Sequence, residues 1–458
     1  MKKYINITML VALAITSLSL SSCKNEVDEI FSEDAVTRLA EERDRYLDIL
    51  TDKGGKWQME YFATDREQGY VYVMTFAKNG SVTISGKNKW ISYQLPEANN
   101  GSVVYGSEVS LWDIITDSGP VLTFNTYNRV FHVFADPADI PSMSDQEEVE
   151  TGYGHEGDYE FELMKYSGDT LYVEGKKYGV KMIMTRLAAD TNDEDYLNEV
   201  SFNVSSTYSA KIPRTYMILP DGKRWFVYFD ASSSSLSMYA EGADSISTTE
   251  SHNVIFTHDG MAFMTPHTFT GNPGHVYELH RFELQEDGSL IHVDEDGTTL
   301  LTADPVADQL MDTRFTWQVD NLSMVGGKYE DLLATLASEL TAFNKSTLRY
   351  IQISYDKNEN CFNLIFNAKK SGAGTAFNPK FYFTIERKGD TQVKLNMRPT
   401  GDRAAEQFIV KCPTMRAIVD ELGAATLNLE PNSVLSPIQF TMSEQGNDDN
   451  YMLWNLIK

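Results

Sequence analysis

Apolar and polar side chains alternate along most of this chain, which is the pattern of half-buried β-strands. The alternation is clear from Lys56 to Tyr61 and from Tyr70 to Phe76, and Asn79-Gly80 then connects the second segment to Ser81–Ile84. An Asn-Gly pair tolerates the positive φ of a two-residue hairpin turn. We therefore expect an antiparallel hairpin here, opening a β domain.

The same pattern predicts further strands at Trp90–Leu95, Val103–Ile115, Val121–Phe124, Val130–Phe134, Tyr159–Tyr166, Thr170–Glu174 and Val180–Leu187. Many short strands with regular turns indicate an antiparallel sandwich or barrel. The Gly55-Lys56-Trp57 triplet resembles the start of lipocalin-like barrels. We expect a mainly β fold with a few helices, in which a sandwich or lipocalin-like barrel is followed by further β-rich and α+β regions.

Helical spacing of apolar residues appears in three longer segments. It predicts one helix from Asp34 to Gly54, a second between Gly327 and Asn344, and a third from Thr414 to Leu422 with Pro413 in its first turn. A short helix is expected to open at Tyr196-Leu197, and Gln407–Lys411 is expected to be a strand. These elements divide the chain into residues 1–22 (signal), 23–32 (tether), 33–189 (helix and antiparallel β domain), 196–304 (second β-rich region) and 305–458 (α+β region).

Composition narrows the classes of partner. Apolar residues make up 42% of the chain and aromatic residues 12%, which argues for packed cores. The formal net charge of −27 repels phosphate backbones, so we expect no nucleic-acid partner. Beyond Cys23 only Cys361 and Cys412 remain, and two cysteines make either one bridge or two buried thiols.

The first residues resemble a bacterial lipoprotein signal. Lys2 and Lys3 precede an apolar segment, Ile5–Leu20, and the run Leu20-Ser21-Ser22-Cys23 follows it. The segment is too short and too polar for a spanning helix. The resemblance implies cleavage before Cys23 and acyl chains such as palmitate on that residue, which would hold the protein to a membrane. An ordinary signal peptide, with Cys23 incidental, is the alternative.

A family resemblance rests on four segments, which are Val121–Asn128, His132, His155–Phe161 with Gly154 before it, and Gly175-Lys176-Lys177. Together they resemble a Bacteroidetes lipoprotein family, domain of unknown function four-three-zero-two. The resemblance implies an outer-membrane location, on the periplasmic or cell-surface face, and association with TonB-dependent receptors and their lipoprotein partners in nutrient uptake. It assigns no catalytic residue and no cofactor.

Two sets of residues are candidate sites. Trp90, Tyr93, Tyr105 and Trp112 form an aromatic set that either stacks on a ligand or alternates into the core. His132, His155, Glu156 and Asp158 are a candidate metal site, with a loop that enters a strand as the alternative. His155-Glu156 is not the metalloprotease motif, because no second histidine stands at the required helical spacing.

Histidines concentrate in the second β-rich region. Six of the eight lie there, namely His252, His258, His267, His275, His280 and His292. Imidazole binds zinc, copper and haem iron, but no pair has the short spacing of a strong zinc motif. Scattered surface and turn histidines are the alternative.

These observations support one leading function and two alternatives. We expect a lipid-anchored outer-membrane accessory or ligand-binding protein without catalytic activity. A metal or haem scavenger that uses the histidine-rich region is the first alternative. A glycan or peptide hydrolase is the second, although the sequence contains no nucleophile-elbow or phosphate-loop motif.

Overall fold

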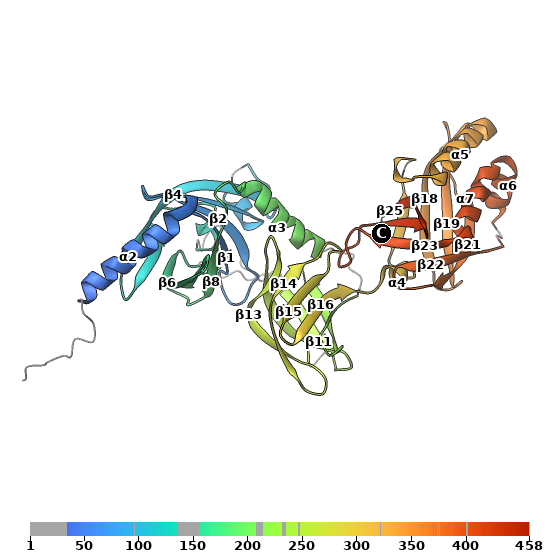
Figure 1. Cartoon of the computed structure of the whole chain (residues 1–458). Coiled ribbons are helices and arrows are strands. Elements are labelled where there is room, and N and C mark those ends of the chain that lie inside the picture. Colours follow the sequence, from blue (N-terminus) through green and yellow to red (C-terminus); the bar gives the residue numbers. More distant parts are fainter. Residues whose placement is uncertain are drawn as a thin grey trace, which may run out of the picture.

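The computed structural model describes residues 34–457 apart from 96, 136–154, 208–213, 231–234, 246–247, 321, 373, 375 and 400–401 (Figure 1). Cys23 and the rest of the predicted signal and tether lie outside the described residues. The chain forms two antiparallel barrels and then a C-terminal region of strands and helices. The predicted mainly β fold with a few helices is therefore confirmed. Within the described part of the chain, no helix is long and apolar enough to cross a membrane.

The first barrel closes eight strands in sequence order. Its strands are β1 (Lys56–Tyr61), β2 (Tyr70–Phe76), β3 (Ser81–Asn88), β4 (Val104–Thr116), β5 (Pro120–Phe124), β6 (Glu160–Ser167), β7 (Thr170–Gly175) and β8 (Lys181–Arg186). Pairing of β1 with β8, with Trp57 opposite Arg186, closes the ring. The predicted Asn79-Gly80 hairpin joins β2 to β3, and Gly80 has a φ of 83°.

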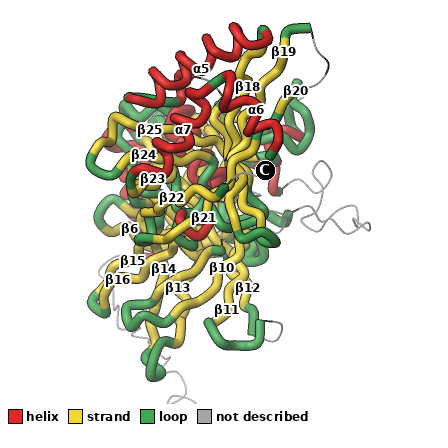
Figure 2. The backbone as a smooth tube through the Cα atoms, turned by 90° about the vertical axis from the view of Figure 1, so that its right-hand side faces the viewer, coloured by secondary structure: helices red, strands yellow, loops and turns green. Residues whose placement is uncertain are grey.

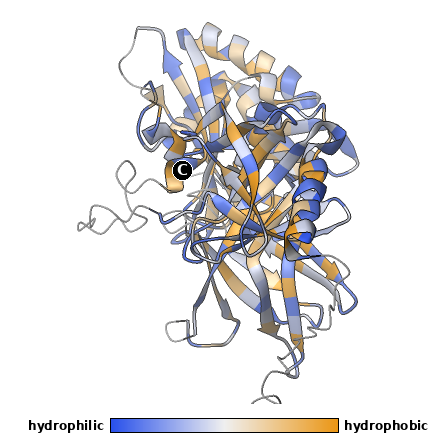
Figure 3. Cartoon of the chain, turned by 90° about the vertical axis from the view of Figure 1, so that its left-hand side faces the viewer, coloured by the Kyte–Doolittle hydropathy of each residue, from blue (hydrophilic) through white to orange (hydrophobic). Residues whose placement is uncertain are grey.

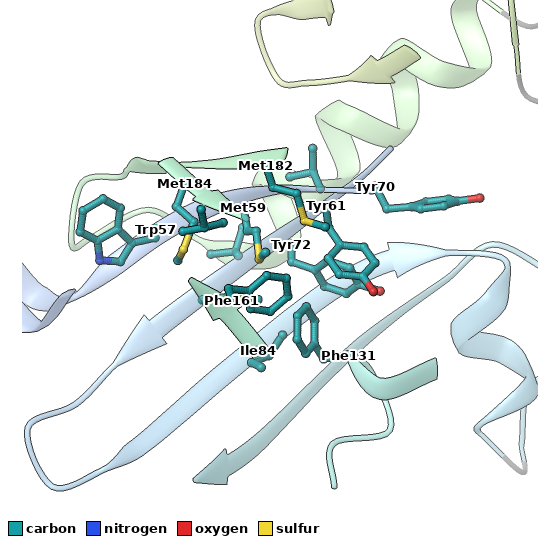
Figure 4. Packing of buried hydrophobic residues seen from close by; sticks show 14 of the residues in the cluster. Trp57, Met59, Tyr61, Tyr70, Tyr72, Ile84, Phe131, Phe161, Met182 and Met184 are labelled. Atoms are coloured by element: carbon teal, nitrogen blue, oxygen red, sulfur yellow. The ribbon is translucent and has the colours of Figure 1, made fainter. Parts of the chain in front are cut away.

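Aromatic side chains fill this barrel (Figure 4). Trp57, Met59 and Tyr61 alternate inward along β1, and none of them is exposed. The Tyr61 ring stacks on Phe134 and meets Phe131 edge to face, at centroid distances of 5.5 and 5.3 Å. Each fully buried aromatic side chain contributes roughly 1.5–3 kcal/mol of hydrophobic free energy, so this cluster dominates the stability of the barrel.

Helix α2 (Ala35–Thr51) packs its apolar side against the first barrel. The Asp34 carboxylate caps its first turn by accepting a hydrogen bond from the Thr37 amide at 2.8 Å. At the other end, the indole N–H of Trp57 donates to the Leu50 carbonyl at 2.9 Å. Tyr46 and Leu50 are buried, so the helix shares the core of the barrel.

Two predicted strands are wrong, and one physical cause explains both. Trp90–Leu95 begins with the short 3₁₀ helix η2 (Trp90–Tyr93), and Val130–Phe134 contains η3 (His132–Phe134). Asn88 accepts hydrogen bonds from the amides of residues 90 and 91, and Asn128 does the same for residues 130 and 131, at 3.0–3.1 Å. An asparagine side chain that satisfies these amides favours a turn over a strand.

Helix α3 (Asp193–Thr207) connects the two barrels and lies against both (Figure 1). Asp193, at its first turn, accepts a hydrogen bond from Lys56 Nζ at 2.7 Å in the first barrel. Asn203, ten residues later, donates to the Thr257 carbonyl at 2.9 Å in the second barrel. The helix therefore fixes the position of one barrel relative to the other.

The second barrel also closes eight strands, and apolar and polar residues alternate along them (Figure 3). Its strands are β9 (Thr215–Ile218), β10 (Arg224–Asp230), β11 (Ser235–Ala240), β12 (Glu250–Phe256), β13 (Gly260–Thr270), β14 (Val276–Leu284), β15 (Leu290–Asp294) and β16 (Gly297–Ala303). The pairing of β16 with β9 closes the ring, with Leu301 opposite Met217.

The C-terminal region is one antiparallel sheet, and its helices α5 (Lys328–Asn344), α6 (Arg403–Lys411) and α7 (Pro413–Ala424) lie together in Figure 2. Its strands are β17 (Thr316–Val319), β18 (Ser346–Asp356), β19 (Cys361–Lys370), β20 (Ala376–Phe377), β21 (Lys380–Arg387), β22 (Gln392–Arg398), β23 (Thr426–Pro431), β24 (Gln439–Glu444) and β25 (Asn447–Leu456). Its helices are α4 (Val306–Gln309), α5 (Lys328–Asn344), α6 (Arg403–Lys411) and α7 (Pro413–Ala424), with the short η4 (Leu322–Met324).

In this region the predicted strand at Gln407–Lys411 is wrong, because these residues lie in α6, whose start is capped by Asp402. Cys361 and Cys412 are buried, free thiols. Burial raises the pKa of Cys412 to about 11, so this thiol stays protonated at neutral pH.

The loop between β23 and β24 reaches into the second barrel. The Val434 amide donates to the Asp287 carbonyl at 2.7 Å, and Leu435, which is 1% exposed, packs within the core of that barrel. A side chain of the C-terminal region thus completes the second barrel.

Candidate functional site

The predicted aromatic set does not form one site. Trp90 lies beside Tyr70, at the start of β2, and its indole N–H donates to the Tyr70 hydroxyl at 2.7 Å. Trp112 packs edge to face on Phe76, at the end of β2, with a centroid distance of 4.9 Å. Seven residues of strand span roughly 20 Å, so the two indoles lie at opposite ends of the barrel. Both are buried.

The two tyrosines of the set also belong to the barrel wall. Tyr93 stacks on Trp90, with ring centroids 6.1 Å apart. Tyr105, on β4, donates a long hydrogen bond of 3.4 Å to Ser85 Oγ. Both tyrosines are partly buried against the core of the first barrel. All four residues therefore pack in or against the core of the first barrel, with Trp90 and Tyr93 on the 3₁₀ helix η2 and Tyr105 and Trp112 on β4.

The four residues of the predicted metal site point to different partners. His155 is 1% exposed, and its Nδ1 lies 2.9 Å from a carboxylate oxygen of Glu67. The pKa of Glu67 is raised by burial, and the hydrogen bond from His155 partly opposes that rise. His132 Nδ1 accepts a hydrogen bond from the Asn128 amide at 3.0 Å. The two imidazoles therefore belong to separate parts of the barrel wall.

The two carboxylates of this set are also engaged. Glu156 forms an ion pair with Arg66 at 3.0 Å. Asp158 accepts hydrogen bonds from the amides of Lys177 and Tyr178, both at 3.0 Å, and so stabilises the turn that leaves β7. Among the described residues, no three His, Cys, Asp or Glu side chains gather as a metal site. The structure does not bring the four predicted ligands together.

The six histidines of the second barrel are mostly dispersed. His275 is exposed and His258 is half-buried, and both lie near carboxylates. His292 Nδ1 lies 2.7 Å from the Arg281 carbonyl. His252 and His267 are the exception, because their rings lie 4.3 Å apart on neighbouring strands. Burial, followed by repulsion from His267, lowers the pKa of His252 to about 4. This pair lacks a third ligand among the described residues.

A cleft between the two barrels is a feature that sequence reasoning missed. Its cavity volume is about 420 Å³, within the range of roughly 300–1,000 Å³ that is usual for ligand pockets. The outer face of β6, β7 and β8 forms one wall, with Met164, Tyr172 and Ile183. The facing wall comes from β13 and β14 of the second barrel, including Met264 and His280.

Strand irregularities direct side chains into this cleft from both sides. The register of β6 against β7 shifts between Leu163 and Lys165, which leaves Met164 as an extra, exposed residue. The register of β13 against β14 is interrupted between Ala262 and His267, around Met264. Bulges re-aim side chains and are common beside functional sites. The flexible, polarisable methionine side chain adapts to ligands of varied shape.

An ion pair between the barrels lies along this cleft. Glu60 faces outward from β1, yet it is only 4% exposed because the second barrel covers it. Arg281 donates a hydrogen bond to its carboxylate. Burial raises the pKa of Glu60, and attraction to Arg281 works against that rise. Only the Glu60 side of this pair is buried, since the Arg281 side chain is 43% exposed, and the pair links the first barrel to the second.

A second cavity, also of about 420 Å³, adjoins the first and shares Lys181, Met264 and Thr265 with it. Its lining is more polar and includes Thr64 and Tyr178. Because they share these residues, the two cavities form one cleft, and we call the more apolar cavity its inner part and the more polar cavity its outer part. We call this whole feature the inter-barrel cleft.

The two barrels also meet closely at Gly69. The Gly69 amide in the first barrel donates to the Val254 carbonyl on β12 at 2.8 Å. A Cβ atom at Gly69 would lie 2.8 Å from side-chain atoms of Ile255 and Phe62, closer than real Cβ contacts allow. Only glycine permits this approach.

The inter-barrel cleft was not predicted, because it depends on how two separate barrels pack. A partial signal was present. Tyr172 and Ile183 stand at outward positions of neighbouring strands, directly opposite each other in the register of β7 and β8. Apolar residues on the outer face of a barrel need a partner.

Comparisons with known proteins give one family and no informative structural relative. The model of the Domain of unknown function (DUF4302) matches residues 27–277. No curated protein matches the chain. Among solved structures, transferrin binding protein B from serogroup B Neisseria meningitidis is 7% identical, with 88% of this chain and 76% of that chain covered and a TM-score of 0.14.

The DNA polymerase III subunit beta from Borrelia burgdorferi is 10% identical, with 92% and 97% of the two chains covered and a TM-score of 0.12. At such TM-scores neither similarity carries an argument about this protein.

Proposed function

Because the chain belongs to the DUF4302 family, we propose that it is a non-catalytic, ligand-binding lipoprotein of the outer membrane, accessory to a TonB-dependent nutrient-uptake system. A lipid on Cys23 would hold it there, as the signal Leu20-Ser21-Ser22-Cys23 suggests. This family has no assigned activity, so the proposal depends on the site itself.

The inter-barrel cleft is the observation that carries the proposal. It has the volume of a ligand pocket and mostly apolar walls. Its two walls belong to different barrels, and α3 holds those barrels in position. A site built on rigid elements is preorganised, which lowers the entropic cost of binding.

Isolation of the protein from native membranes under mild detergent tests the accessory role. We expect a TonB-dependent receptor, or a lipoprotein that partners one, to be recovered together with the tagged chain. A chain carrying Cys23→Ala is the matched control, because it keeps every described residue and loses the proposed lipid attachment site. Recovery of neither partner with the unaltered chain would contradict the proposal.

Mass spectrometry of the cell-made protein tests the anchor separately. We expect the amino-terminal peptide to begin at Cys23 and to carry acyl chains. An unmodified sulfur at this position would leave a secreted protein without an anchor, whatever the pulldown gives.

A further inference from the structure

We propose that the inter-barrel cleft binds a neutral amphiphile, namely a single hydrocarbon chain that carries an uncharged, hydroxylated head group. This inference rests on the proposed function, since it names the chemistry of the ligand for that cleft. The chain would lie in the inner part and the head group in the outer part.

The inner part suits a hydrocarbon chain. Its walls are formed by Phe62, Met164, Tyr172, Ile183 and Met264, with Pro266 at the edge. Met164 is 56% exposed and Tyr172 43% exposed, so a ligand there would remove apolar surface that the protein leaves open to water. Each methylene group buried in this way contributes about 0.8 kcal/mol.

The cations that line the cleft each have a carboxylate beside them. Arg281 pairs with Glu60 at the inner part. Lys181 stands opposite Glu174 in the register of β7 and β8. With a carboxylate beside each cation, an anionic head group would find no uncompensated counter-charge among them.

The outer part is also unsuited to an anionic head group. Arg66 pairs with Glu156 there, at 3.0 Å. Asp65 adds a negative charge, and the chain as a whole carries −27, both of which repel an anionic head group. Thr64, Thr265 and Tyr178 supply hydroxyl groups instead. Hydroxyl groups donate and accept hydrogen bonds, which suits an uncharged, hydroxylated head group.

Three probes with the same dodecyl chain test the charge preference. They are dodecyl maltoside, dodecanoate and dodecyltrimethylammonium, titrated below their critical micelle concentrations against the full chain carrying Cys23→Ser. Calorimetry gives the Kd values. We expect dodecyl maltoside to bind at least roughly tenfold more tightly than dodecanoate, and more tightly than dodecyltrimethylammonium, which cannot hydrogen-bond to the hydroxyl groups of the outer part. Equal binding of all three, or preference for a charged head group, would overturn the proposal.

Chain length and position give independent readouts. Decyl maltoside has two methylene groups fewer and should bind roughly fifteenfold more weakly, the equivalent of about 0.8 kcal/mol per group. Met164→Asp, in the exposed cleft wall, should weaken binding by roughly tenfold or more. Val109→Asp is the matched control, because Val109 is 65% exposed on β4 of the same barrel and does not line the cleft. An equal effect of both variants would place binding elsewhere.

The two proposals fail in distinguishable ways. Absence of probe binding, with an uptake receptor recovered from membranes, overturns the ligand class and leaves the accessory role. Cleft-specific binding without a recovered receptor overturns the accessory role and leaves the ligand class. In the protein labelled with [methyl-¹³C]methionine, the methyl signals of Met164 and Met264 should shift when dodecyl maltoside is added. In the Met164→Asp protein the Met264 signal should stay unchanged.

Discussion

The two barrels have the same strand number and order but treat their buried tryptophans differently. In the first barrel, Trp57 and Trp112 donate their indole N–H groups to backbone carbonyl oxygens at 2.9 and 3.0 Å. In the second, Trp225 Nε1 is buried without a hydrogen-bond partner among the described residues. A buried unpaired donor costs roughly 1–3 kcal/mol. We therefore expect Trp225 to contribute less to the stability of the second barrel than Trp57 and Trp112 contribute to that of the first.

Loss of an aromatic anchor should show the largest difference. Trp57→Ala removes a side chain with 0% exposure that also lies under the Arg186 guanidinium at 4.2 Å. It should destabilise the first barrel by about 3–5 kcal/mol. Because a multi-barrel chain has no single unfolding free energy, hydrogen exchange of peptides from β1–β8 and β9–β16 is the appropriate measurement. Trp225→Ala should cost less in the second barrel, and an equal cost would contradict the comparison.

Acid should weaken the second barrel through His252. Its folded pKa, about 4, lies below the ordinary value of 6.5, so the unfolded chain binds the proton first. Stability is therefore complete above about pH 6.5 and falls as the pH drops towards 4, by at most about 1.4 kcal/mol per pH unit. The Glu250 carboxylate, 3.5 Å from His252 Nε2, is 55% exposed and offsets this only weakly.

His252→Phe should flatten this pH dependence for peptides of β9–β16 and leave β1–β8 unchanged. An unaltered slope in the variant would show that His252 is not the responsible group. His267 is the nearest alternative, because burial lowers its pKa as well.

The contact between the barrels should tolerate no side chain at position 69. Gly69→Val places atoms against Ile255 and Phe62 and should cost about 1–3 kcal/mol by overpacking. Exchange should rise in β2 and β12 together. Gly119→Val is the control, because nothing lies within 4 Å of a Cβ at that position. Unchanged hydrogen exchange in the Gly69→Val protein would mean that the barrels separate easily.

The smallest effect isolates the hydrogen bonds. Trp112→Phe removes the donor to the Ser81 carbonyl and should cost about 1 kcal/mol more than the lost ring area. Trp225→Phe loses no hydrogen bond among the described residues, so it should cost only the ring area. Hydrogen-exchange measurements on the two variants under the same conditions compare what one tryptophan hydrogen bond contributes in each barrel.

Much of the fold follows from local sequence. Alternation predicted the β1–β3 hairpins, because one face of each strand must enter the core. Helical spacing predicted α2, α5 and α7, and the capping residue Asp34 and the first-turn Pro413 stand where those helices begin. The errors at η2 and η3 share a cause, since Asn88 and Asn128 turn apolar segments away from the ladder.

No local sequence pattern predicted the candidate site. Trp90, His155 and Asp158 were candidate ligand-binding or metal-binding residues in the sequence. In the structure each of them hydrogen-bonds to another group of the first barrel. The inter-barrel cleft depends on the packing of two closed barrels, which helix α3 and the contact at Gly69 hold together. Sequence patterns report which face of a strand is apolar, and they do not report which neighbour covers it.

Leu435 has a practical consequence for dividing the chain. The family match ends at residue 277, on β14, in the middle of the second barrel. Even a fragment that runs to the end of β16 would lack Leu435, which reaches that barrel from more than a hundred residues downstream. Expression of the matched region by itself should therefore give an incompletely folded product, and the segment to produce is one that continues through the C-terminal sheet.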